Sequence, residues 1–109
     1  WGIYNIKHNI NKNNFVIKSV VEKPTQKSAP SNKAVIGRYI LPKSIFKKLN
    51  KLKPGKSGEI HITDAIQELI DSGEKFIGHN FLGKYLDCGT MSGYIKSSLD
   101  VSKLWNYVW

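Results

Sequence analysis

Alternating apolar and polar residues near the start of the chain predict two β-strands. Residues 2–7 (GIYNIK) and 15–22 (FVIKSVVE) are short runs rich in β-branched side chains, and this composition favours strands. The Asn-rich stretch at 8–14 has the composition of a hairpin loop, and Pro24 stops the second run. Because a short loop joins antiparallel neighbours, we expect part of the sheet to be antiparallel.

Three further strands are predicted later in the chain. Residues 34–41 (AVIGRYIL) form an apolar run, which follows a loop at 25–33 that contains Pro, Ser and Asn. Gly37 lies inside this run, and a glycine in a strand often marks a bulge or a close approach by another group. The runs at 75–81 and 84–88 predict two short strands around a Leu-Gly pair.

Apolar residues spaced three and four apart predict a helix that begins near residue 62. Its stripe consists of Ile62, Ala65, Ile66, Leu69 and Ile70, the spacing of one helix face.

The ends of this helix carry the expected signals. Thr63 is predicted as its N-cap, Asp64 suits the positive end of the helix, and Gly73 can end it. A short basic helix is predicted at 43–50, after Pro42. A final amphipathic helix is predicted at 90–105, capped by Thr90 or Ser92.

Strands and helices are interleaved without an internal repeat or a clear domain boundary. The 109 residues suffice for one small domain, and a hydrophobic content of 40% allows a packed core. The predicted class is therefore α/β, in a single unit over residues 1–109. No apolar run approaches the roughly eighteen residues of a membrane span, so no membrane contact is expected. Cys88 is the only cysteine, which excludes an internal disulfide and fits a reducing cytoplasm.

The net charge of +9 should attract anions such as nucleic acids or phosphorylated metabolites. Lysine supplies most of this charge, and Arg38 is the only arginine. Because proteins that recognise DNA bases rely on arginine, sequence-specific DNA binding is disfavoured.

Few residues have the spacing of a known catalytic or metal site. The three histidines and the single cysteine do not form a zinc pattern. The GKSGE segment at 55–59 contains Gly-Lys-Ser, but the first glycine of a phosphate-binding P-loop is missing upstream. The remaining candidates are Glu22-Lys23, Gly37 and the LDCGT segment at 86–90.

Glu22 and Lys23 allow two interpretations when they are considered alone. Neighbours in a strand point to opposite faces, so the two side chains cannot both belong to the core. They could form a solvated strand end, or a carboxylate could bind sugar hydroxyls while the ammonium binds a phosphate. Asp87 is likewise open to two interpretations: it could stabilise a turn or take part in a site.

Four segments in order resemble the C-terminal part of bacterial glucose-1-phosphate uridylyltransferases, a branch of the sugar-nucleotidyltransferase family. They are VVEKP (20–24), APSNKAVIGRYIL (29–41), GEIHITDAIQEL (58–69) and LDCGTMSGYIKS (86–97). The resemblance covers nearly the whole chain. It implies the sugar-binding part of a Rossmann-like domain with a mixed sheet, without the N-terminal nucleotide-binding half.

The resemblance also implies roles for individual residues. Glu22 matches a glutamate that holds sugar hydroxyls, and Lys23 matches a lysine that contacts phosphates in the substrate and the transition state. Gly2 matches a glycine whose backbone lies against the sugar, and Val35 matches a main-chain contact to the sugar. Asp87 matches an aspartate that helps to bind the metal in thymidylyltransferase relatives.

The implied reaction joins UTP and glucose-1-phosphate to give UDP-glucose and pyrophosphate, with Mg²⁺ as cofactor. The family's Gly-rich loop and main metal ligand are not in this sequence, so we expect the 109-residue chain alone to be inactive. The complete enzyme is expected to be a cytoplasmic homo-oligomer. Alternatives are a thymidylyltransferase or another sugar-nucleotidyltransferase, and, in a different class, a basic nucleic-acid-binding module with exposed aromatics.

Overall fold

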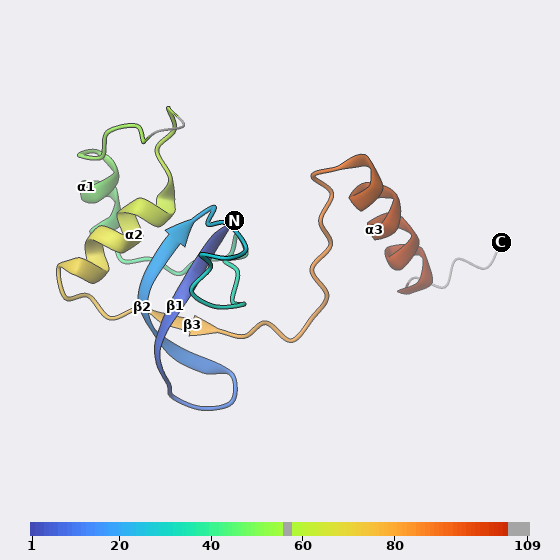
Figure 1. The fold of residues 1–109 in the computed structure, drawn as a ribbon, viewed down its shortest axis with the longest axis horizontal. Coiled ribbons are helices and arrows are strands. Elements are labelled where there is room, and N and C mark those ends of the chain that lie inside the picture. The colour runs from blue at the N-terminus through green and yellow to red at the C-terminus, as the bar shows by residue number, and fades with distance from the viewer. Residues whose placement is uncertain (56–57, 105–109) are drawn as a thin grey trace.

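A computed structural model of the chain describes residues 1–55 and 58–104, and it contains three strands and three helices (Figure 1). In chain order these are β1 (Gly2–Asn9), β2 (Asn14–Glu22), α1 (Ile45–Leu49), α2 (Ile62–Asp71), β3 (Ile77–His79) and α3 (Met91–Leu104). The predicted α/β class is confirmed. No helix in these described ranges is both long and apolar enough to cross a bilayer.

Strands β1 and β2 form the predicted antiparallel hairpin, in which Gly2 is paired with Glu22 and Asn9 with Phe15. The asparagines of the loop explain why the chain turns there. The side-chain oxygen of Asn11 accepts hydrogen bonds from the backbone N–H groups of Asn13 and Asn14, both at 2.9 Å, as asparagine does in turns. This pairing brings the end of β2 beside the beginning of β1.

The third strand is shorter than the predicted run at 75–81. β3 pairs antiparallel with the start of β2, with His79 opposite Asn14, which gives the sheet order β1-β2-β3. Within the described residues all strand pairs are therefore antiparallel. The strand predicted at 84–88 is wrong, because this segment has no ladder partner there. Its Lys84 instead forms an ion pair of 2.6 Å with Asp100 of α3.

The strand predicted at 34–41 is also wrong, and Gly37 explains why. Ala34 makes one isolated bridge with Ile3, and the Val35 N–H donates to the Gly2 carbonyl at 2.8 Å. The Arg38 N–H then bonds the Ile36 carbonyl across Gly37, which is the pattern of a three-residue γ-turn. The chain therefore leaves β1 at this glycine.

Helix α2 confirms the predicted stripe but not its cap. The N-cap is His61, so Thr63 lies inside the first turn, together with Asp64 as expected. The helix ends at Asp71, and Gly73 follows with a φ of +93°, a conformation that glycine adopts without strain.

Helix α2 packs against both β2 and α1. The resulting core is made of buried apolar side chains: Val20, Val35, Ile45, Ala65, Ile66 and Leu69. Helix α1 is shorter than the predicted 43–50 helix and buries only Ile45.

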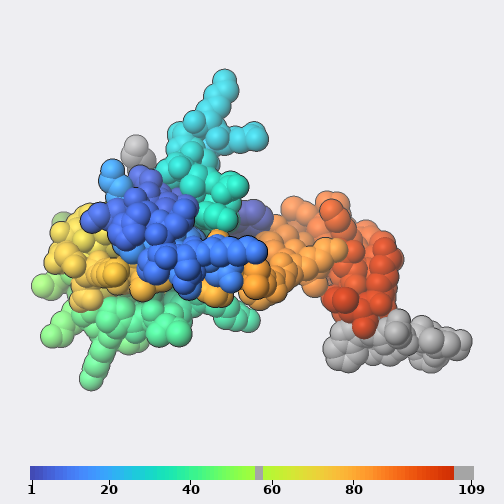
Figure 2. Space-filling view, turned by 90° about the horizontal axis from the view of Figure 1, so that it is seen from below, coloured from blue at the N-terminus to red at the C-terminus, as the bar shows by residue number. Residues whose placement is uncertain are grey.

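Helix α3 begins with the predicted Thr90 cap, whose hydroxyl accepts a hydrogen bond from the Gly93 N–H at 3.1 Å. Its predicted last residue, 105, lies outside the described residues. Figures 1 and 2 show α3 at one end of the molecule, away from α1 and α2. Its apolar residues Met91, Tyr94 and Ile95 are exposed.

The core predicts which of two identical substitutions affects stability. Ile66 is 2% exposed whereas Ile40 is fully exposed. Ile66→Val should lower the free energy of unfolding by about 0.5–1.5 kcal/mol, because it deletes one buried methyl group. Ile40→Val should change it by less than about 0.5 kcal/mol. Denaturant unfolding of both variants checks this, and equal effects would contradict the packing of α2 on β2.

Candidate functional site

Glu22 occupies the last position of β2 and is held there by the first turn of α2. Its side chain is 21% exposed. The hydroxyl of Thr63 donates a hydrogen bond of 2.8 Å to Glu22 Oε2. A partly buried carboxylate needs such partners, so this contact fixes one of its two oxygens.

Gly2 lies against this carboxylate with no room for a side chain. A Cβ atom placed on Gly2 would lie 3.0 Å from Thr63 Cγ2, 3.1 Å from Val35 Cγ2 and 3.2 Å from Glu22 Oε2. Glycine is therefore the residue that lets β1 approach α2 so closely. The structure thus brings together three of the residues that the sequence singled out: Gly2, Glu22 and Val35.

Lys23 follows in an unusual backbone conformation, with a φ of +44°. Left-handed values are uncommon for residues other than glycine, and such strain often occurs at functional sites. The backbone N–H of Lys23 donates to the Trp1 carbonyl at 3.0 Å. The expected alternation does not apply to this pair, because β2 ends at Glu22 and Lys23 follows the strand. Both residues contribute to the lining of one hollow.

The hollow has a volume of about 330 Å³. Its lining combines the predicted residues with others that the sequence analysis missed, and the residues are Trp1, Gly2, Glu22, Lys23, Val35, Gly37, Tyr39, His61, Ile62 and Thr63. The missed residues come from three different segments, so no local pattern could have grouped them.

The electrostatics of the hollow combine donors and acceptors. Lys23 Nζ lies 4.0 Å from Glu59 Oε2, and His61 Nε2 lies 3.7 Å from the same oxygen. Partial burial, together with the charge of Glu22, raises the pKa of Tyr39. Tyr39 therefore keeps its hydroxyl proton at neutral pH. The hollow can offer a carboxylate acceptor, a neutral hydroxyl and an ammonium to one polar ligand.

Asp87 is not among the residues that line this hollow. It is exposed, and its Oδ1 accepts a hydrogen bond of 2.9 Å from the Gly89 N–H, as in a turn. Across residues 1–55 and 58–104, no group of three His, Cys, Asp or Glu side chains could hold a metal ion. Mg²⁺ prefers six oxygen ligands, so Asp87 fits as a single ligand and the described residues do not complete a site.

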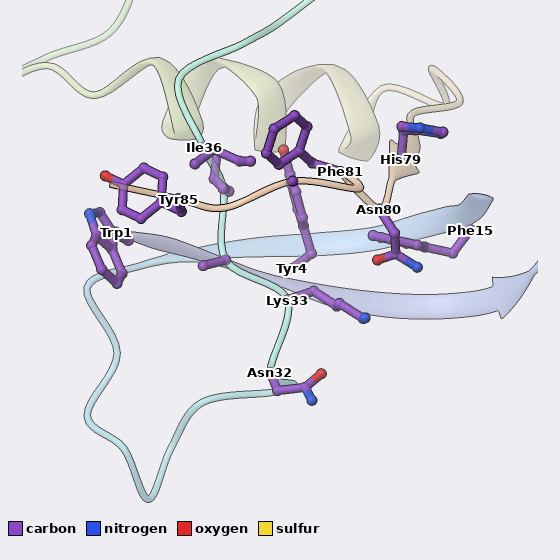
Figure 3. Close-up of a pocket in the computed structure, with 13 residues that line it drawn as sticks. Trp1, Tyr4, Phe15, Asn32, Lys33, Ile36, His79, Asn80, Phe81 and Tyr85 are labelled. Carbon is purple, nitrogen blue, oxygen red and sulfur yellow. The ribbon is translucent and has the colours of Figure 1, made fainter. Parts of the chain in front are cut away.

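A second hollow of about 260 Å³ shares Trp1 and Val35 with the first. Figure 3 shows the residues that line this second hollow. Its walls are aromatic, and the ring of Trp1 meets that of Tyr85 edge-on at 5.4 Å. None of its lining residues is acidic. It therefore lacks the carboxylate that would hold sugar hydroxyls.

Comparison with known proteins decides the family. The sequence profile of nucleotidyl transferases matches residues 2–103. The chain belongs to the nucleotidyl transferase family. A Pseudomonas aeruginosa relative named UTP–glucose-1-phosphate uridylyltransferase is 45% identical over 84 residues, which are 77% of this chain and 30% of the relative. A Mycoplasma genitalium protein of the same name is 40% identical over 89 residues, 82% of this chain and 30% of that protein.

Solved structures of nucleotidyl transferases have the same fold. A UDP-glucose pyrophosphorylase complexed with UDP-glucose matches with a TM-score of 0.85 and 43% identity, over 95% of this chain and 39% of that one. A UTP-bound enzyme from Acinetobacter baumannii matches with a TM-score of 0.74 and 34% identity, over 94% of this chain and 34% of that one. This nucleotidyl transferase chain thus spans about 30% of the length of its curated relatives.

The backbone of Lys23 predicts an unusual response to glycine. Lys23→Gly should leave the free energy of unfolding within about 0.5 kcal/mol or raise it, because relief of left-handed strain offsets the larger entropy of the unfolded chain. Lys18→Gly, at an exposed position inside β2, should lower it by about 0.5–1 kcal/mol. Thermal unfolding of the two variants measures the difference. An equal loss in both would show that Lys23 has an ordinary backbone.

Proposed function

We propose that this chain is the C-terminal, sugar-binding part of an enzyme that forms UDP-glucose and pyrophosphate from UTP and glucose-1-phosphate. The observation that carries the proposal is the hollow in which Gly2, Glu22, Lys23 and Val35 meet. The names of the relatives support the same reaction. A thymidylyltransferase would use the same sugar-binding groups, and the base would distinguish it.

The groups of the hollow suit a sugar phosphate. Glu22 has one oxygen bound to Thr63, which leaves Oε1 to accept hydrogen bonds from sugar hydroxyls. Lys23 is 63% exposed, so its ammonium can reach a phosphate. A volume of about 330 Å³ is at the small end of the range for ligand pockets. We therefore assign the sugar to Glu22 and the phosphate to Lys23.

In the proposed reaction, a phosphate oxygen of glucose-1-phosphate attacks the α-phosphorus of UTP and the bond to pyrophosphate breaks. Such transfers are accelerated mainly by positioning and by neutralising the negative charge of the transferred group. Glu22 would fix the sugar, and the backbone of Gly2 would lie against it. Lys23 would place a positive charge beside the phosphates. We assign no step to Mg²⁺ in this chain, because the described residues provide Asp87 alone.

Two substitutions in the complete enzyme test this assignment. Glu22→Gln removes the charge that strengthens hydrogen bonds to sugar hydroxyls. A hydrogen bond to a charged group contributes roughly 1.5–3 kcal/mol, so KM for glucose-1-phosphate should rise about ten-fold or more. Lys23→Ala should lower kcat as well, because its charge also faces the transition state. Steady-state kinetics with each substrate varied measures both effects.

Lys18→Ala is the matched control, since Lys18 is exposed on the same strand and does not line the hollow. Its kinetics should be those of the unmodified enzyme. If Glu22 and Lys23 are only a solvated strand end, all three variants will behave alike. Unchanged kinetics in Glu22→Gln and Lys23→Ala would refute the proposed function.

The 109-residue chain should form no UDP-glucose from UTP and glucose-1-phosphate. In the proposed division of roles the described residues contribute sugar and phosphate contacts, but they contain no group of three His, Cys, Asp or Glu side chains that could hold a metal ion. A coupled assay for pyrophosphate release at increasing chain concentration measures this. Turnover that rises in proportion to the chain concentration would contradict the division of roles proposed above.

A further inference from the structure

The side chain of Thr63 makes two contacts, one through its methyl group and one through its hydroxyl. It is 5% exposed within the first turn of α2. Its methyl group Cγ2 packs against Gly2, where a Cβ atom would lie only 3.0 Å away. Its hydroxyl donates to Glu22 Oε2 at 2.8 Å. Because a β-branched side chain is stiff at χ1, the methyl contact fixes the direction of the hydroxyl.

The hydroxyl is not used to cap the helix. His61 is the N-cap, and no side chain caps α2. A threonine in a helix can bond a carbonyl of the preceding turn. This hydroxyl instead donates to Glu22, which lies 41 residues earlier in the chain. Its effect is therefore on Glu22.

We propose that Thr63 is a positioning residue that sets the orientation of the Glu22 carboxylate for sugar binding. This inference rests on the proposed function. Thr63 holds Oε2, whereas Oε1 lies 3.9 Å from the Trp1 main-chain nitrogen, beyond hydrogen-bonding distance. Oε1 is thus the oxygen that is left for a sugar hydroxyl. A glutamate fixed before binding loses less side-chain entropy when the sugar arrives.

A second contact of α2 provides a control for helix placement. Gln67 lies one turn after Thr63, and its Oε1 accepts a hydrogen bond of 2.8 Å from the Val20 N–H of β2. It ties the same helix to the same strand, but it does not touch Glu22. A Gln67 variant therefore shows the effect of loosening α2 alone, and a Thr63 variant can be compared with it to detect loss of carboxylate orientation.

The test is steady-state kinetics of the complete enzyme carrying Thr63→Val, Thr63→Ser or Gln67→Met. Thr63→Val removes the hydroxyl and should raise KM for glucose-1-phosphate about ten-fold, with KM for UTP unchanged. Thr63→Ser keeps the hydroxyl but loses the methyl contact that directs it, so KM for glucose-1-phosphate should rise by only about three-fold, less than in Thr63→Val. Gln67→Met should lower thermal stability while leaving KM for the sugar phosphate within about two-fold. Thr63→Ala replaces Thr63→Val if the valine variant does not fold.

A double-mutant cycle with Glu22→Ala separates failure of this inference from failure of the proposed function. Thr63→Val should have no further effect on KM when Glu22 is absent, because it acts through that carboxylate. An undiminished effect in that background overturns the inference, as does an equal rise in KM for Thr63→Ser or Gln67→Met. If Glu22→Ala itself leaves KM unchanged, the proposed sugar site is wrong.

Discussion

The contact between helix α2 and strand β2 is the constraint on which the candidate site depends. Two polar contacts one helical turn apart join them, from Thr63 to Glu22 and from Gln67 to Val20. Between these contacts, Ile66 belongs to the buried core. Apolar burial supplies most of the stability but has no preferred direction. The hydrogen bonds are directional, so they fix which residue of the strand meets the start of the helix.

The end of β2 shows what this fixed contact makes possible. Glu22 is held by α2, and the chain then turns through the left-handed conformation of Lys23. Strained residues persist where the surrounding structure over-determines them. Here the Lys23 N–H bonds the Trp1 carbonyl, and Gly2 lets β1 lie close to the helix. As a result an acidic and a basic side chain, adjacent in sequence, line one hollow.

Local patterns predicted the hairpin and α2, because their periodicities are those of strand and helix and their partners are near in sequence. They failed for 34–41. This apolar run turns at Gly37, and Val35 packs in the core although the run forms no β-ladder. The resemblance assigns ligand-binding roles to Glu22 and Lys23, and these roles stay predictions. Thr63 was mistaken for a cap, since a threonine near a helix start has the same local signature whether it bonds its own helix or a distant carboxylate.

The predicted site residues are placed by two different sets of contacts. Gly2, Glu22, Lys23 and Val35 are placed by the hairpin and α2, whereas Asp87 lies on the segment that leads to α3. That segment is tied to its own helix, because Lys84 donates a hydrogen bond that holds the pKa of Asp100 below its ordinary value. The apolar residues of α3 are exposed, and such surfaces are commonly covered by a partner. The groups proposed to bind the sugar are therefore organised by the core between β2 and α2. Asp87 instead lies on a segment that contacts the hairpin through Tyr85 and Trp1, and contacts α3 through Lys84.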